Sequence, residues 1–283
     1  MSGPDFTIPE DRLPEGFARA VDRPPERPAE PRPAATIVLL RDGDRGGLEV
    51  LLLRRVRSAG FVPGAWVFPG GRVDLDDATP ALVERLEGLS REQAAARLGL
   101  EPDAEPPGVA YWVAALREAF EETGILVGRD ADGRPAPSIA DRPEVRALRD
   151  ELLEDEDRFP SILDRMGCRM DGAAMEYVAH WITPVAEPRR YDTRFFAAAV
   201  AREQEVALAE AELTDHAWLT PDEALSRREE GSLPMVFPTI RTLEGLRGFS
   251  TPMEALRAYR ARAIPTILPR LVRTPTGIGI EVD

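Results

Sequence analysis

The sequence of 283 residues contains no lysine and no asparagine, one cysteine and two histidines. Without lysine the chain can form no Schiff base and has no lysine general base. A P-loop nucleotidase, which needs a lysine on the phosphates, is likewise excluded. The single cysteine, Cys168, can form no internal disulfide, which fits a reducing cytoplasm. We interpret Cys168 as a packed thiol, because no catalytic partner for it is evident.

The other scarce features exclude further classes of protein. The two histidines, His180 and His216, fall in different expected strands, and a zinc site would need more histidine or cysteine, so we interpret both as structural. A net charge of −14 argues against nucleic acid as a partner, because such binding needs a basic surface. No apolar stretch approaches the length of a membrane span, and the first residues lack the apolar core of a signal peptide. We therefore expect a cytoplasmic protein without a membrane partner.

The periodicity of apolar residues predicts an α/β protein with a peripheral segment at each end. Strand patterns at 34–41, 48–55, 65–69, 177–183, 193–201 and 216–219 are interspersed with helix patterns at 81–89, 91–98, 110–123, 144–164, 221–229, 238–247 and 252–263. Residues 1–33, rich in proline, arginine and acidic residues, are expected to form a flexible or extended arm, and 264–283 a C-terminal tail. The main domain then spans 34–263, with helical inserts at about 78–106 and 144–164. We interpret the acidic run within the second insert as a solvated face.

The most informative run is REAFEETGI at residues 117–125. It places Glu118, Glu121 and Glu122 at positions i, i+3 and i+4 of an expected helix, which puts the three carboxylates on one face. Like charges at this spacing repel, so the cluster is explained best by a divalent cation beside it; hard carboxylate oxygens suit Mg²⁺ or Mn²⁺. Arg117 lies one turn before Glu121 and could hold a carboxylate in place. The alternative is an ordinary solvated glutamate face, which is common for glutamates alone.

A second segment favours the metal site over the solvated glutamate face. Upstream stands FPGGRVD at 68–74, a strand end followed by a Gly70-Gly71 turn, where glycines let backbone amides approach a ligand. Together the two segments resemble the signature of the Nudix hydrolases, G-x5-E-x7-R-E-U-x-E-E-x-G-U, in which U is aliphatic. Gly71 matches the leading glycine, and the second half is matched by Arg117, Glu118, Glu121, Glu122, Gly124 and Ile125.

Two departures from the signature concern its middle. The position six residues after Gly71 is Asp77 rather than glutamate, and Asp74 is an equal candidate for this acidic role. The signature has seven residues where this chain has 39, at positions 78–116, so 32 residues are inserted. Such an insertion is compatible with the fold, because the cost of loop closure grows slowly with length.

The resemblance implies a fold, an activity and roles for individual residues. The fold would be the Nudix α/β/α sandwich with a mixed sheet, here enlarged by helical insertions. The activity would be hydrolysis of a diphosphate linkage in a nucleotide derivative with Mg²⁺ or Mn²⁺ as cofactor. Glu118, Glu121 and Glu122 would face the metal and Arg117 would orient them, while Gly70 and Gly71 would shape the substrate loop. In some members the general base lies on a late loop, which here offers Glu205, Glu210 and Glu212; we choose Glu212 because it falls just before the strand at 214–218.

A further resemblance narrows the substrate. The segments HWITP at 180–184 and RRYDTRFF at 189–196 are similar to the coenzyme A diphosphatase branch typified by the mammalian peroxisomal enzyme, which also carries a long insertion in its signature. This likeness implies hydrolysis of coenzyme A or acyl-coenzyme A to 3′,5′-ADP and (acyl-)4′-phosphopantetheine. Arg189, Arg190 and Arg194 could then bind the substrate phosphates. Alternatively, they belong to a loop-to-strand junction and pair with the protein's own carboxylates.

Three questions stay open at this point. The substrate could instead be ADP-ribose, NADH or another nucleotide diphosphate derivative. The chain could also be a non-catalytic Nudix module that senses a nucleotide, although the intact acidic set argues against this. The helical inserts could cover the site or pack a homodimer.

Overall fold

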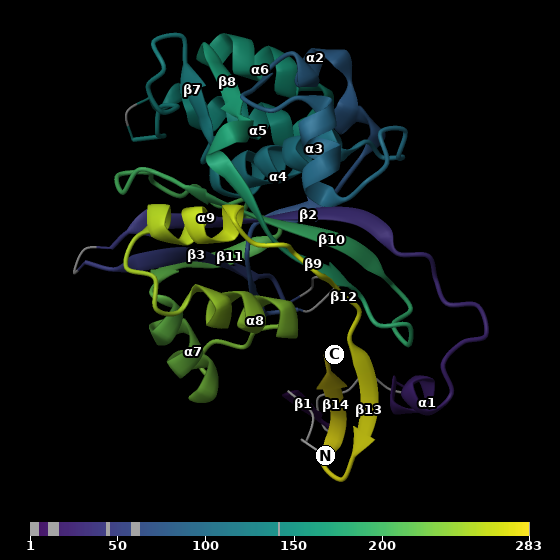
Figure 1. Cartoon of the computed structure of the whole chain (residues 1–283). Helices are drawn as coiled ribbons and strands as arrows, with labels where there is room; N and C mark the ends of the chain where they lie inside the picture. The colour runs from purple at the N-terminus through teal and green to yellow at the C-terminus, as the bar shows by residue number, and fades with distance from the viewer. Residues whose placement is uncertain (1–5, 11–16, 44–45, 58–62, 141, 283) are drawn as a thin grey trace.

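The computed structural model describes residues 6–10, 17–43, 46–57, 63–140 and 142–282, and a mixed sheet forms its centre (Figure 1). The strand order of this sheet is β11-β3-β2-β10-β9-β12, with β4 paired to β3 and β5 paired to β2. The strands are β2 (Arg32–Asp42), β3 (Leu48–Arg55), β4 (Trp66–Val67), β5 (Gly70–Arg72), β9 (Met175–Ile182), β10 (Tyr191–Ala199), β11 (Leu213–Leu219) and β12 (Thr266–Ile267). β10 runs parallel to β2 and β12 parallel to β9, while the remaining pairs are antiparallel.

Both faces of the sheet are buried, which defines the three layers. Alternate residues of β2 point to opposite sides: Ile37 and Leu39 pack with the helix α4 (Gly108–Thr123), whereas Val38 and Leu40 belong to the opposite cluster. That second cluster is built with three C-terminal helices, α7 (Pro221–Glu229), α8 (Phe237–Leu246) and α9 (Pro252–Arg260). The expected α/β/α sandwich with a mixed sheet is confirmed.

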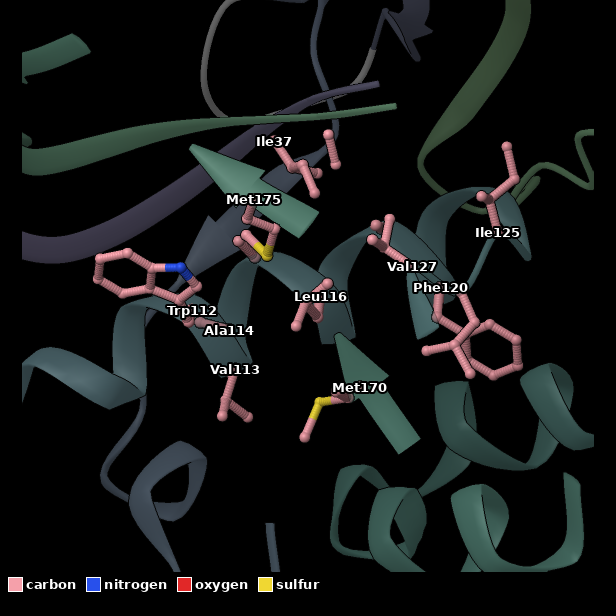
Figure 2. Close-up of a cluster of buried hydrophobic side chains, with 14 of the residues drawn as sticks. Ile37, Trp112, Val113, Ala114, Leu116, Phe120, Ile125, Val127, Met170 and Met175 are labelled. Carbon is pink, nitrogen blue, oxygen red and sulfur yellow. The ribbon is translucent and has the colours of Figure 1, made fainter. Parts of the chain in front are cut away.

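Helix α4 is enclosed on all sides. Fifteen of its 16 residues are buried, and Glu118 is the exception. Figure 2 shows Ile37 and Met175 of the main sheet on one side of the helix and Met170 on the other. Trp112 packs on Phe196 of β10 with ring centroids 4.6 Å apart. Polar side chains on this helix therefore lie in surroundings that screen charge far less than water does.

The inserts form the layer that covers α4 away from the sheet (Figure 1). The helices are α2 (Pro80–Val83), α3 (Arg91–Leu98), α5 (Glu144–Glu154) and α6 (Phe159–Met166), with 3-10 turns at Leu75–Ala78 and Glu156–Arg158. A small sheet, β6-β8-β7, joins Leu86–Glu87, Cys168–Asp171 and Gly128–Asp130. The expected helix at 81–89 was wrong in its second half, because β6 pairs with β8 there and Gly88 adopts a left-handed φ of 70°.

The two ends of the chain differ from the arm and tail that the sequence suggested. β1 (Phe6–Pro9) pairs with β14 (Gly277–Glu281), which pairs with β13 (Arg270–Thr274), so both ends share one antiparallel sheet. A short helix, α1 (Phe17–Asp22), contacts β13. The sequence analysis missed these strands. β1 and β14 pair although they lie more than 250 residues apart in the sequence, and β13 pairs with β14, which carries no strong strand pattern. Within the described ranges no helix has the length and apolar character to cross a bilayer.

Candidate active site

The two glycines of the turn lie against the helix that carries the acidic residues. Gly70 begins β5 beside β2, and a Cβ there would lie 2.5 Å from the carbonyl oxygen of Ala35. A Cβ on Gly71 would lie 2.2 Å from Oε1 of Glu118. The absence of side chains at these positions therefore lets β5 and the carboxylate of Glu118 approach directly. The backbone N–H of Gly70 donates a hydrogen bond of 3.1 Å to Oε2 of Glu122.

Arg117 joins the acidic residues of the site into one network. Its Nε donates to Oδ1 of Asp77 at 2.8 Å, and its Nη2 donates to Oδ2 of Asp77 at 3.1 Å and to the carbonyl of Arg72 at 3.2 Å. Its Nη1 donates to Oε1 of both Glu118 and Glu121, at 3.1 and 3.0 Å. Burial lowers the pKa of Arg117, but the hydrogen bond to Asp77 and the surrounding carboxylates outweigh it, so the pKa is raised. The guanidinium is thus charged and fixed from both sides.

The structure distinguishes the two candidates for the acidic position after the glycine turn. Asp77 is buried against Arg117, and its Oδ2 also accepts a hydrogen bond of 2.9 Å from the backbone N–H of Asp74. The side chain of Asp74 is 46% exposed and lies 3.9 Å from the guanidinium of Arg72. Of the two, Asp77 is therefore the one that bonds to Arg117 beside the acidic residues of α4.

The three glutamates of α4 are hard to ionise in the protein alone. Burial raises the pKa of Glu118 to about 8, with Arg117 opposing the shift and Glu121 and Asp77 adding to it. Burial also raises the pKa of Glu121 to about 7, again against Arg117. The pKa of Glu122 is raised by burial and by the charge of Glu118. The positive charge of Arg117 does not offset the burial of Glu118 and Glu121, and a bound cation would supply more.

The residues present fit a divalent cation that keeps part of its water shell. Within the described ranges, no three acidic, cysteine or histidine side chains form a complete metal cage. Nη1 of Arg117 bonds to Glu118 and Glu121. Mg²⁺ is usually held by one or two carboxylates together with waters and substrate phosphates, so a complete cage is not required. The oxygen donors and the raised pKa values of Glu118 and Glu121 are consistent with such a site.

The C-terminal end of α4 positions the late loop. The last four carbonyls of a helix need partners from outside it. Gly124, which stops the helix as predicted with a φ of 72°, donates its N–H to Phe120 at 2.8 Å. The carbonyls of Glu122 and Thr123 accept from the backbone N–H groups of Ala209 and Ala207, at 3.2 and 2.8 Å, and that of Glu121 from Nη1 of Arg149 at 3.3 Å. The loop before β11 is therefore tied to the residues that carry the acidic set.

The three candidate bases on this loop have different surroundings. Glu212 is exposed, immediately precedes β11, and is close enough to Glu122 for its charge to raise the pKa of that residue. Glu210 instead lies near Arg149. Burial lowers the pKa of Arg149, and the charge of Glu210 opposes this effect in part. Glu205 is exposed without a resolved effect on the acidic set. The geometry brings Glu212, of the three, toward α4.

The arginines of RRYDTRFF bind other parts of the protein. Arg190 is buried and donates to the carbonyls of Thr183 and Ala29, at 2.9 and 2.8 Å. Arg194 is buried beside the N-terminal half of α4, where its Nη1 donates to the carbonyl of Leu98 and the hydroxyl of Tyr177, both at 3.0 Å. Arg189 is exposed. Two of the three predicted phosphate ligands, Arg190 and Arg194, thus donate hydrogen bonds to oxygens of the protein itself, away from the acidic site.

His180 belongs to the same structural region. Its Nε2 lies 2.5 Å from Oδ1 of Asp192, and its Nδ1 lies 2.8 Å from Oγ1 of Thr266. These contacts join β9, β10 and β12. The arrangement agrees with the interpretation of His180 as structural.

Two side chains near the acidic set were missed by the sequence analysis. Arg55, the last residue of β3, pairs in register with Leu213, and its charge lowers the pKa of Glu122 against the effect of burial. Its Nε is buried and has no hydrogen-bond partner within the described ranges. Glu156 lies in the acidic run that we interpreted as a solvated face, yet its Oε2 is 3.6 Å from Nη1 of Arg117. No spacing rule could have found either residue, because both positions depend on how distant segments pack.

A solved structure and a family model both match this chain. A solved Nudix hydrolase from Alicyclobacillus acidocaldarius is 32% identical, with a TM-score of 0.68, and the match covers 81% of this chain and 96% of that one. The fold of this chain is thus that of a Nudix hydrolase. The family model described as the NUDT19 Nudix domain matches residues 31–246. The chain belongs to the NUDT19 Nudix domain family, and the predicted resemblance is confirmed.

Several curated relatives of this chain are named for one activity. The acyl-coenzyme A diphosphatase NUDT19 of Gallus gallus is 31% identical over 240 residues, which are 72% of this chain and 62% of the chicken protein. The human protein of the same name is 26% identical over 265 residues, which are 82% of this chain and 70% of the human one. The match thus spans somewhat less than two thirds of the chicken protein. Nudix hydrolases generally use divalent metal ions, in line with the chemistry of the donor set.

Proposed function

We propose that this protein hydrolyses the diphosphate linkage of coenzyme A or acyl-coenzyme A, giving 3′,5′-ADP and (acyl-)4′-phosphopantetheine. The observation that carries the proposal is the complete acidic set of α4, bonded through Arg117 to Asp77 and facing the Gly70-Gly71 turn. The substrate class is supported by relatives named acyl-coenzyme A diphosphatase over most of this chain. A purely nucleotide-sensing module would not need four buried charged groups, which are costly to maintain without a task.

Within this proposal the cofactor is Mg²⁺ or Mn²⁺, held by Glu118, Glu121 and Glu122. When bound, such a cation neutralises the oxygens of a diphosphate and lowers the pKa of a water molecule. Arg117 fixes the orientation of Glu118 and Glu121 through Nη1, and Asp77 fixes Arg117 in turn. The N–H of Gly70 donates a hydrogen bond to Oε2 of Glu122, which fixes the distance between the glycine turn and the acidic face of α4.

We assign two further roles, accepting the proton of the water and binding the phosphates, to residues at the edge of the acidic set. A water molecule attacks one phosphorus atom, the bridging P–O bond breaks, and a carboxylate of Glu212 accepts the proton of the water. Glu212 is supported by its exposure and by its proximity to Glu122. Arg55 is the better candidate for contact with the diphosphate than Arg190 or Arg194, because its charge acts on Glu122 of the acidic set, whereas the other two arginines donate hydrogen bonds to oxygens of the protein itself. The cytoplasm remains the proposed compartment, supported by the single, buried cysteine.

The test is a product assay with purified full-length protein. Coenzyme A, acetyl-coenzyme A, ADP-ribose and NADH would be incubated with Mg²⁺ or Mn²⁺, and nucleotide products would be separated by chromatography. We expect 3′,5′-ADP from wild type, and a loss of about a hundredfold or more in kcat/KM for Glu121→Gln. Turnover of ADP-ribose or NADH alone would keep the Nudix chemistry and reject the coenzyme A assignment. No turnover of any substrate, together with tight nucleotide binding, would favour the sensing module.

A further inference from the structure

The last four carbonyls of α4 all have partners beyond the end of the helix, and one of these partners comes from the second insert. Three of the carbonyls accept from backbone N–H groups, at 2.8 to 3.2 Å. The fourth, that of Glu121, accepts from Nη1 of Arg149 at 3.3 Å. The carboxylate of the same residue accepts from Nη1 of Arg117 at 3.0 Å. Glu121 is thus held by two arginines, one at its side chain and one at its peptide carbonyl.

Arg149 lies on the buried face of α5. The apolar residues of this face, Val145, Leu148 and Leu152, belong to the same buried cluster as those of α4. Arg149 itself is 4% exposed, and its Nε is buried without a hydrogen-bond partner among the residues that the structure describes. Burial lowers its pKa, so the charges around it, with Asp150 at 3.1 Å, do not offset the loss of solvent. An apolar side chain would pack here at lower cost, which indicates that the guanidinium does more than fill space.

The same guanidinium lies beside the loop that carries Glu212. The charge of Glu210 acts on Arg149 and opposes the effect of burial in part. The N–H of Ala209 donates to the carbonyl of Glu122 at 3.2 Å, and the carbonyl of Ala209 accepts from the N–H of Glu212 at 3.0 Å. The end of α4, the helix α5 and the late loop therefore meet around Arg149.

We propose that Arg149 is a positioning residue, supplied by the second insert, that holds Glu121 and the loop bearing Glu212 in place for hydrolysis. The inference rests on the proposed function, in which Glu121 binds the cofactor and Glu212 accepts a proton. Arg149 is not expected to contact the substrate, because it is buried and its Nη1 is directed to the main chain. A displacement of about 1 Å in a catalytic group can slow a reaction by about a hundredfold, so the loss of this bond should reduce the rate rather than substrate binding.

The kinetic test compares two arginines of the same insert. Arg149→Met removes the donor and keeps a long apolar side chain; we expect kcat for coenzyme A to fall by about tenfold, with KM within about twofold of wild type. Arg149→Lys should recover kcat to within about threefold, because an ammonium group can still donate to one carbonyl. Arg142→Met is the matched control, since Nη1 of Arg142 donates at 3.1 Å to the carbonyl of Met166, the last residue of α6. That variant should leave kcat within about twofold.

Amide hydrogen exchange tests the positioning without substrate. In Arg149→Met, the N–H groups of Ala207 and Ala209, which bond to the end of α4, should exchange about tenfold faster than in wild type. Arg142→Met should leave this exchange unchanged. Glu210→Gln keeps Arg149 and lies at an exposed position, so it should fold and should speed the same exchange by about threefold. It is the variant to use if Arg149→Met does not fold.

Other outcomes separate this inference from the proposed function. A lower Tm for Arg149→Met with unchanged kcat and exchange would mean that Arg149 only stabilises the fold, and would reject its positioning role. Equal losses of kcat in the Arg149→Met and Arg142→Met variants would show a general effect of the insert and would also reject it. A rise in KM as large as the fall in kcat would make Arg149 a substrate contact instead. If wild type turns over no substrate while exchange responds to Arg149→Met, the proposed function fails and the hold of Arg149 on the loop stands.

Discussion

Two buried arginines at opposite ends of α4 have different partners and therefore different consequences. Arg117 and Arg194 are 3% and 6% exposed, and both come from segments that resemble Nudix motifs. Arg117 bonds to three carboxylates and lies 3.6 Å from a fourth. Arg194 donates to a carbonyl and a tyrosine hydroxyl, and its Nε has no hydrogen-bond partner among the residues that the structure describes, although Asp192 lies 3.5 Å away.

The difference shows that a motif match does not by itself assign a role to a charged residue. At the C-terminal half of α4, positive charge is outnumbered by negative charge, and a cation is needed to balance the site. At the N-terminal half, the guanidinium of Arg194 lies 5.7 Å from the ring of Tyr111 and ties α3, through Leu98, to the sheet. The first arrangement suits catalysis and the second suits positioning of the insert. The following predictions test this division.

The largest effect is expected for Arg117→Leu. The substitution leaves Asp77 and Glu121 buried without their counter-charge, which typically costs about 3–5 kcal/mol of stability. The Tm should fall by about 10 °C, and activity should be lost even below that temperature. Thermal denaturation followed by circular dichroism, with the product assay at 20 °C, measures both. A stable variant that retains activity would remove Arg117 from the centre of the site.

Gly71→Ala should impair activity with less effect on folding. The added Cβ would lie 2.2 Å from Oε1 of Glu118, so the carboxylate must move away from the turn. A displacement of about 1 Å in a catalytic group can reduce kcat by about a hundredfold. Gly133→Ala is the control, since nothing lies within 4 Å of a Cβ there, although its left-handed φ adds backbone strain. Equal kcat values for the two variants would show that Glu118 does not need its present position.

Local pattern and tertiary packing explain which parts of this comparison could be predicted. The strand at Leu48–Arg55 and the helices at Arg91–Leu98 and Pro221–Glu229 have the predicted bounds, because period, caps and turns are local signals. The grouping of Arg117 with Glu118 and Glu121 follows from helical spacing alone. The contacts of Arg55 and Glu156 could not be predicted, since β3 and the second insert meet α4 only after folding. The same holds for β1 and β14 at the two ends of the chain.

Arg194→Leu should destabilise the protein moderately and leave catalysis nearly intact. The loss leaves the carbonyl of Leu98 and the hydroxyl of Tyr177 without a donor, at a cost of about 1–3 kcal/mol. We expect a fall in Tm of a few degrees and kcat/KM within about threefold of wild type. For Arg55→Leu, the matched comparison, we expect the opposite result: KM for coenzyme A should rise by about tenfold with little change in Tm. If instead Arg194→Leu raised KM without lowering Tm, Arg194 would bind phosphate, as the resemblance implied.

The smallest effect is expected from pH in metal-free protein. The pKa of Glu121 is raised by burial to about 7, whereas in the unfolded chain it is near its ordinary value of 4.5, so the folded state binds the proton more tightly. The stabilising effect is complete below about pH 4.5 and is lost as pH rises through 7. Between pH 6 and 8.5, stability should therefore fall by about 1 kcal/mol more in wild type than in Glu121→Gln, which cannot ionise. Urea denaturation in EDTA at both pH values measures this difference. Added Mg²⁺ should reverse the trend in wild type, because ionised carboxylates bind the cation, and parallel curves for the two proteins would contradict the raised pKa.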